Sequence, residues 1–123
     1  MNSIKKITIS KNEINDYKDL ILFKNTKLID LRGNLHILFS SYDINVELCF
    51  GKDIFFSSLE NFLESDKCYE YLIIDGLPLI LKYSKNCTKL IFAKLWEIVY
   101  KKEINVIILD TTDILDNFYT NLI

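Results

Sequence analysis

The stretch Ile104-Asn105-Val106-Ile107-Ile108-Leu109-Asp110 decides the fold class of this chain. Its continuous apolar run from Val106 to Leu109 is typical of a central parallel strand covered by helices on both faces. The segment Tyr69–Asp75 (YEYLIID) has the same character, because it is strongly apolar towards its end. The two segments together predict a sheet that is buried on both sides.

Strands and helices alternate along the rest of the chain. Strands are predicted over Lys6–Ser10, Lys27–Leu31, Ile44–Phe50, Tyr69–Asp75 and Ile104–Asp110. Helices are predicted from Asn15 or Asp16 to about Lys24, over Leu35–Tyr42 (where a strand is the alternative), from Ser57 to about Ser65, from Asn86 or Thr88 to about Lys102, and over Asp113–Leu122. This alternation predicts an α/β fold, in which a mostly parallel sheet is flanked by helices in a single domain, residues 1–123.

Local motifs refine these boundaries. Ser57-Ser58-Leu59-Glu60 has the form of a capping box, in which the first serine caps the helix and the glutamate reaches back. Gly76-Leu77-Pro78 is expected to end the strand after Asp75, and a polar stretch, Lys82–Lys89, follows. Alternation within the third strand predicts that four side chains point the same way: Ile44, Val46, Leu48 and Phe50.

The composition excludes several functional classes. The chain carries 17 acidic and 15 basic side chains, a net charge of −2, which excludes a strongly basic nucleic-acid module. No apolar run approaches the roughly 18–20 residues of a membrane helix, and no long apolar stretch follows the first lysines, so neither a membrane span nor a signal peptide is expected. With only 3 glycines, the chain is poorly supplied for a phosphate-binding loop.

The cysteines and the histidine predict no metal site. Cys49, Cys68 and Cys87 are widely spaced, form no Cys-x-x-Cys pair, and are accompanied by a single histidine, His36. Because zinc needs about four clustered ligands, these cysteines are expected to be free thiols of an intracellular protein. Cys49 lies in an alternating apolar run and is expected to pack as a small hydrophobic side chain.

The helix that ends near Lys102 has more apolar surface than one buried face requires. On a helical wheel its apolar side chains cover roughly 220°, against a little over about 100° for an ordinary surface helix. Two explanations are open. Either the helix packs between neighbouring helices of its own domain, or Phe92, Trp96 and Tyr100 form part of an interface with another protein.

Three aspartates end predicted strands at the edge where open parallel sheets bind their ligands. These are Asp30, Asp75 and Asp110, and Asp113 follows closely. Gathered there, the carboxylates could hold Mg²⁺ for phosphoryl chemistry. Alternatively, each aspartate only terminates its strand and caps the next turn, which is a common role.

Four segments follow one another in an order that resembles a known family. Leu28–Leu35 (LIDLRGNL) is similar to a strand that reads apolar-Ile-Asp-Thr-Glu-Gly, and Asn45–Leu48 with Ser57–Leu59 to the strand and helix after it. Leu72–Gly76 (LIIDG) is similar to a Walker B strand, whose aspartate holds magnesium, and Leu90–Asp110 to the next helix and strand. This order resembles the RecA-type recombinase family, especially its eukaryotic paralogues. The resemblance implies a degenerate, truncated RecA-like core of the P-loop NTPase type.

The chain departs from that family at the nucleotide site. The first strand leads into Lys11–Asn15, which lacks the Gly-x-x-x-x-Gly-Lys-Ser/Thr loop. Arg32 occupies the position of the catalytic glutamate. The resemblance therefore implies that the protein is not an enzyme, binds no nucleotide cofactor or metal, and keeps Asp75 only as a degenerate Walker B-like strand end.

Within the family, the chain is similar to the smallest RecA-like subunit of the budding-yeast Shu complex, which also lacks the phosphate loop. This implies a nuclear, non-catalytic subunit of a recombination-mediator complex that promotes recombinase filament assembly in homologous-recombination DNA repair. Its partners would be a RecA-like paralogue subunit and a zinc-binding SWIM-domain subunit, with the recombinase and DNA contacted indirectly. The closing aromatic segment of that subunit corresponds to Phe118 and Tyr119, which join the candidate interface.

The loop after the Walker B strand faces DNA in RecA-type folds. Here it would carry Lys82, Lys85 and Lys89, which makes these lysines candidates for a weak DNA contact, or simply for a solvated loop. Two alternative functions stay open from the residues alone. One is a small Mg²⁺-dependent α/β enzyme that uses Asp30, Asp75 and Asp110, and the other is a phage or bacterial α/β interaction module.

Overall fold

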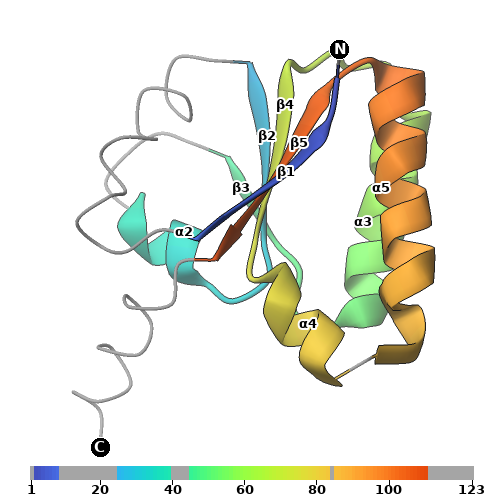
Figure 1. The fold of residues 1–123 in the computed structure, drawn as a ribbon. Coiled ribbons are helices and arrows are strands. Elements are labelled where there is room, and N and C mark those ends of the chain that lie inside the picture. The colour runs from blue at the N-terminus through green and yellow to red at the C-terminus, as the bar shows by residue number, and fades with distance from the viewer. Residues whose placement is uncertain (1, 9–24, 40–44, 84, 111–123) are drawn as a thin grey trace, which may run out of the picture.

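The computed structural model describes residues 2–8, 25–39, 45–83 and 85–110 (Figure 1). Within these ranges it contains the strands β1 (Ile4–Thr8), β2 (Thr26–Asp30), β3 (Val46–Leu48), β4 (Tyr71–Asp75) and β5 (Asn105–Asp110). The helices are α2 (Asn34–Leu38), α3 (Lys52–Glu64), α4 (Leu77–Tyr83) and α5 (Thr88–Lys102), and a short 3₁₀ helix, η1 (Lys85–Cys87), precedes α5.

All strand pairs are parallel, in the order β1-β5-β4-β2-β3, so the predicted α/β fold is confirmed. Helices α3 and α5 cover one face of the sheet and α2 lies on the other (Figure 1). The steps from β3 to β4 and from β4 to β5 run in one direction along the sheet, whereas the step from β2 to β3 runs in the opposite direction. Crossovers of one hand then place their helices on opposite faces, as observed.

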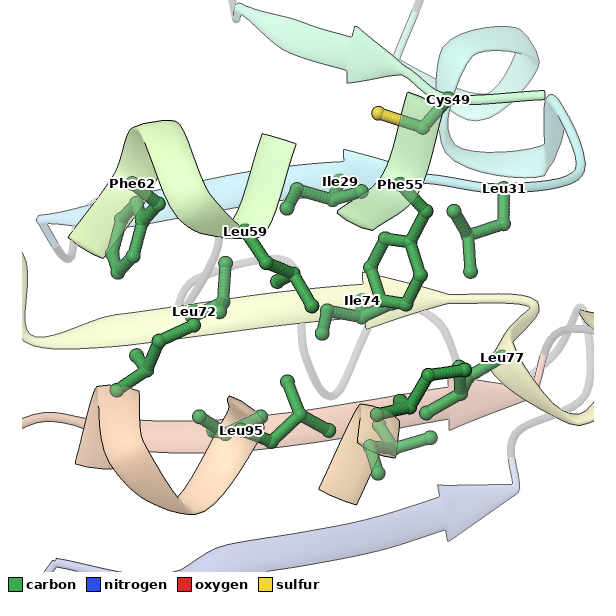
Figure 2. Close-up of a cluster of buried hydrophobic side chains, with 14 of the residues drawn as sticks. Ile29, Leu31, Cys49, Phe55, Leu59, Phe62, Leu72, Ile74, Leu77 and Leu95 are labelled. Atoms are coloured by element: carbon green, nitrogen blue, oxygen red, sulfur yellow. The ribbon is translucent and has the colours of Figure 1, made fainter. Parts of the chain in front are cut away.

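The apolar strand runs are buried from both sides. On the face of α3 and α5, Figure 2 shows Phe55 and Leu59 of α3 directed onto Ile29 and Ile74 of the sheet. A second cluster fills the face of α2, and it contains Leu28, Leu35, Phe39, Ile73, Ile107 and Leu109. Neighbouring residues of β4 and β5 thus alternate between two apolar layers, which is why their sequences show no polar face.

The start of α3 differs from the predicted capping box. The helix begins at Lys52, follows Gly51, and has no side-chain cap, whereas Ser57 lies exposed inside it. Phe55, Leu59 and Phe62 share the buried face of the helix. The burial of Phe55 extends the helix towards its N-terminus, because the tertiary packing of an apolar stripe outweighs a local capping motif.

Strand β4 ends at Asp75, as predicted, but the segment after it is helical where a polar loop was predicted. Helix α4 begins at Leu77 directly after Gly76, and Pro78 occupies its first turn, where proline is tolerated. The polar stretch Lys82–Lys89 consists of the end of α4, the 3₁₀ helix η1 and the start of α5. Thr88 is the first residue of α5, which also has no side-chain cap.

The two edge strands are shifted or shortened. Strand β1 begins at Ile4, two residues before the predicted start, since Ile4 pairs with Val106 and packs on the core. In β3 and just after it, Leu48 and Phe50 are exposed and Cys49 between them is buried, so the face that carries these two apolar side chains is open to solvent at this end of the strand. An edge strand has a neighbour on only one side, which leaves such side chains uncovered.

Some expectations lie outside the described residues. These are the helices predicted over Asn15–Lys24 and Asp113–Leu122, with Phe118 and Tyr119 of the candidate interface. In the part of the chain that is described, no helix is long and apolar enough to cross a membrane.

Candidate functional site

Two of the three strand-end aspartates lie side by side. Asp30 ends β2, Asp75 ends β4, and the two residues pair in register. Asp110 ends β5 opposite Thr8, one residue beyond Leu109, which is the partner of Asp75. The side chain of Asp110 is not among those that the structure describes. The side chains of Asp30 and Asp75 are both fully buried.

The ends of β2 and β4 form the point at which the chain leaves the sheet in two directions. From Asp30 it passes to α2 on one face, and from Asp75 to α4 and α5 on the other (Figure 1). In open α/β sheets, such a topological switch point creates the crevice in which ligands bind. This edge is therefore the first place to look for a site.

The carboxylate of Asp30 is occupied by its own backbone. One oxygen, Oδ1, accepts hydrogen bonds from the amides of Arg32 at 3.1 Å and Gly33 at 2.8 Å. The other, Oδ2, accepts from the amide of His36, in the first turn of α2, at 2.9 Å. This is the arrangement of a residue that caps a turn, because both oxygens stabilise the passage from β2 into α2.

The crevice beside Asp30 is filled by Arg32. Gly76, directly after β4, has a φ of +90°, and the aliphatic part of Arg32 lies against it. A Cβ atom added to Gly76 would lie 2.7 Å from Cδ of Arg32, well inside contact distance. The position of the catalytic glutamate in the RecA resemblance thus holds a side chain that closes the switch point. Among the described residues, no group of three or more His, Cys, Asp or Glu side chains could hold a metal ion.

The apolar face of α5 divides into two parts. Ile91, Leu95, Ile98 and Val99 are buried against the sheet. Trp96 and Tyr100 are 40% and 75% exposed, and their rings stack with centroids 5.9 Å apart. Phe92 is half-buried and lines a cavity instead, so the three predicted interface residues of this helix do not form one exposed patch.

Contacts with the neighbouring helix α3 explain only the side of α5 that lies opposite Trp96. Lys94 of α5 forms ion pairs with Glu60 of α3 and with Glu97, both at 3.4 Å, and Lys101 pairs with Glu97 at 3.1 Å. The hydrogen bond from Lys101, together with Lys94, lowers the pKa of Glu97. At about 100° per residue, Trp96 lies roughly 160° around the helix from Lys94, so packing between helices does not explain its exposed ring.

The three candidate DNA-contacting lysines are near one another in the sequence, but they lie in helices and not in a loop. Lys82 lies in α4, Lys85 in η1 and Lys89 in the first turn of α5, and all three are exposed. Lys82 also lines the cavity beside Phe92.

A polar cluster under α3 was missed by the sequence analysis. Glu47 of β3 accepts a hydrogen bond from the Ser58 hydroxyl of α3, and Lys27 of β2 lies 3.8 Å from its other oxygen. The Cys49 thiol lies 3.6 Å from Glu47 Oε2. Burial raises the pKa of Cys49 to about 11, and Glu47 adds to the shift while the Ser58 hydrogen bond opposes it. The one available signal was the period of β3, which places Glu47 and Cys49 on the same face.

We expect Asp30→Asn to destabilise the fold by about 2–4 kcal/mol, because an amide oxygen cannot replace a carboxylate that accepts three backbone hydrogen bonds. The free energy of unfolding in urea measures this loss. Asp66→Asn, at an exposed position, is the matched control and should change it by less than about 0.5 kcal/mol. An equally small change for Asp30→Asn would contradict the capping role.

We expect Gly76→Ala to cost about 1–3 kcal/mol more than Gly33→Ala, which has the same φ of +90° but only a 4.0 Å contact to Phe50. The extra cost comes from the clash with Arg32, so Arg32→Ala in the Gly76→Ala background should recover it. Thermal or urea unfolding of Gly76→Ala, Gly33→Ala, Arg32→Ala and the Arg32→Ala/Gly76→Ala double variant measures these differences in stability. Equal losses at the two glycines, with no recovery, would show that Arg32 does not fill the crevice.

We expect Cys49 to resist thiol reagents at pH 8 while the exposed Cys68 reacts. A pKa raised from 9.0 to about 11 keeps the buried thiol protonated, and only the thiolate is nucleophilic. The same shift contributes stability below pH 9 that is lost as the pH rises through the folded-state value. Mass spectrometry after labelling with and without urea locates the modified cysteines. Labelling of native Cys49 at the rate of Cys68 would refute this assignment.

Comparisons with protein-family models, with curated protein sequences and with solved structures found no match to this chain. The RecA-type resemblance therefore rests on the sequence motifs alone. Two structural features bear on function independently of it, namely the switch point filled by Arg32 and the exposed pair Trp96–Tyr100.

Proposed function

We propose that this protein is a non-catalytic interaction subunit that binds a partner protein through the Trp96–Tyr100 side of α5. The observation that carries this proposal is the exposed, stacked aromatic pair on a helix whose sheet-facing side is buried and whose Lys94 forms an ion pair with α3. Tryptophan and tyrosine are enriched among the residues that dominate binding energy at protein interfaces. Stacking holds both rings in place, so binding would cost little side-chain entropy.

The proposal favours α5 over the other exposed apolar side chains. Ile37, Leu48, Phe50 and Ile54 are also exposed, around β3 and the start of α3. Single exposed apolar side chains are ordinary on protein surfaces, whereas a tryptophan stacked on a tyrosine places two large rings on one continuous surface. The ion pairs among Glu60, Lys94, Glu97 and Lys101 would form the polar side of the same helix.

The chemistry at the sheet edge supports a role without catalysis. Both oxygens of Asp30 accept backbone hydrogen bonds, and Asp75 is fully buried beside it. A metal ion would have to displace the amides of Arg32, Gly33 and His36 to reach Asp30. That would remove the interactions that begin α2, so the Mg²⁺-dependent enzyme is the weaker alternative.

The finer proposal follows from the sequence resemblance. The chain would be the smallest RecA-like subunit of a Shu-type recombination-mediator complex in the nucleus. It would dock a RecA-like paralogue subunit and a SWIM-domain zinc-binding subunit, and these would bring it to the recombinase and DNA. The exposed side chains of Lys85 and Lys89 support at most a weak, salt-sensitive contact with DNA phosphates.

We expect Tyr100→Asp and Trp96→Asp to reduce binding of the natural partner at least tenfold, because each places a charge in an apolar interface. The tagged chain is purified from its own cells, the co-purifying proteins are identified, and the complex is rebuilt from purified chains to measure affinity. Leu90→Asp is the matched control, since Leu90 is 63% exposed on the same helix but lies on the side of Lys94 and Glu97.

The outcomes separate the two levels of the proposal. A RecA-like partner whose binding falls in both aromatic variants supports the Shu-type assignment. An unrelated partner with the same response supports the interaction subunit and removes that assignment. Unchanged binding in both aromatic variants, with unchanged melting temperatures, would remove the α5 interface. Because Tyr100 is 75% exposed, Tyr100→Asp should leave the fold intact, so unfolding would not explain a loss of binding in this variant.

A further inference from the structure

A cavity of about 280 Å³ lies beside the first half of α5, between this helix, α4 and the edge strand β1. Its apolar lining comes from Leu77, Pro78 and Leu81 of α4, Phe92 of α5 and Ile108 of β5, and two lysine side chains complete it. Leu77 and Ile108 belong to the buried core. The core therefore gives this apolar hollow a fixed floor.

The cavity continues the exposed aromatic surface of α5. Phe92, Trp96 and Tyr100 are spaced by four residues, so they form one ridge along the helix, with about 6 Å along the axis from each to the next. Phe92 is half-buried and lines the cavity, whereas Trp96 and Tyr100 are exposed. The ridge thus leads from the exposed aromatic pair to the cavity.

A ridge of this kind is a packing surface for another helix. Helices pack by fitting rows of side chains four residues apart into the grooves of a neighbour. Among the described helices only α3 runs alongside α5, and it lies on the side of Lys94 (Figure 1). A helix bound along the other side would bring apolar residues, at the i, i+4 and i+7 spacing typical of such complexes, to the aromatic pair and the cavity.

The cavity end of this surface is basic. Within the described residues, β1, α4, η1 and the part of α5 up to Trp96 contain lysines but no aspartate or glutamate. Lys6, Lys85 and Lys89 are exposed, and Lys89 lies only about 20° around the helix from Trp96. The first acidic residue of α5, Glu97, forms ion pairs with lysines of the same helix. A second copy of this chain would place lysines against lysines here, whereas an acidic segment would complement them.

We propose that the occupant is an amphipathic helix of the partner protein with a net negative charge. It lies along the ridge of Phe92, Trp96 and Tyr100 and inserts one aliphatic or aromatic side chain into the cavity. This inference rests on the proposed function, because it extends the Trp96–Tyr100 interface and names the kind of segment that binds there.

The cavity is tested with Leu81→Trp, which places a larger apolar side chain in the lining and leaves less room for an inserted residue. Affinity is measured by calorimetry in the complex rebuilt with the natural partner. We expect Leu81→Trp to weaken binding about tenfold without lowering the melting temperature of the free chain. Leu90→Trp, at an exposed position on the side of Lys94 and Glu97, is the matched control and should keep the parent affinity.

The charge of the occupant is tested with Lys85→Gln/Lys89→Gln. The control, Lys52→Gln/Lys67→Gln, removes the same charge from exposed positions elsewhere. Attraction between exposed charges speeds association and is screened by salt, so the first double variant should associate roughly fivefold more slowly at low ionic strength. The difference should vanish in about 1 M salt, and the control should associate at the rate of the parent.

Photo-crosslinking identifies the occupant without relying on the fold of Leu81→Trp. A diazirine-bearing lysine analogue replaces Lys6, which is exposed and lines the cavity, and the same analogue at Lys52 is the control. Mass spectrometry of the irradiated complex locates the cross-linked peptides. We expect position 6, but not position 52, to label a partner segment with apolar residues at helical spacing and more acidic than basic residues.

Three results would overturn this inference and leave the Trp96–Tyr100 interface in place. They are full affinity of a folded Leu81→Trp variant, equal association rates of the two double lysine variants, and cross-links from position 6 to a second copy of this chain or to a partner segment without the acidic, amphipathic pattern. Unchanged binding in Trp96→Asp and Tyr100→Asp would instead remove the interface itself, and this inference with it.

Discussion

The carboxylate of Asp30 holds together the part of the fold where the chain leaves the sheet in two directions. All strands described here are parallel, so every connection between them must cross a face of the sheet. At β2 and β4, which are neighbours, the crossings begin on opposite faces. The amides that turn the chain out of β2 have no sheet partner at this point, and the buried carboxylate accepts three of them. The start of α2 and the position of Arg32 both follow from these hydrogen bonds.

In this fold, the surfaces that could bind a partner or ligand lie away from the switch point, where open parallel sheets usually bind their ligands. An open parallel sheet offers a ligand crevice at its switch point, but here Arg32 lies against Gly76 and fills it. The surfaces that remain are beside α5. One is the stacked pair Trp96–Tyr100, and the other is the apolar cavity bounded by Phe92 and two lysines. Both result from the same cause, since α5 is apolar over a wider arc than the sheet and α3 can cover.

Local patterns predicted the buried parts of the molecule better than its boundaries. Continuous apolar runs predicted β4 and β5, and the wheel of α5 predicted an excess of apolar surface, because both signals come from many side chains at once. The capping box at Ser57 and the loop expected after Pro78 were wrong. Each prediction rests on a few local residues, and the packing of Phe55 and Leu77 into the core outweighed them. The sequence correctly placed Asp30, Asp75 and Asp110 at the ends of strands, yet it left the strand order and the chemistry of these aspartates open.

What the sequence by itself determined is the fold class and the set of residues that could act: a parallel sheet with aspartates at strand ends, and one helix with surplus aromatic surface. Only the tertiary structure decided how those residues are used. It showed that the Asp30 carboxylate accepts hydrogen bonds from backbone amides and that Arg32 lies against Gly76 at the switch point. It also showed that Phe92 lines a cavity instead of joining the exposed surface of Trp96 and Tyr100. The physical reason is that periodicity records which face of an element is apolar, whereas the partner of each side chain depends on strand order and on residues far away in the chain. Lys6 and Lys82 lie 76 positions apart in the sequence, and only the sheet and α4 bring them to one cavity.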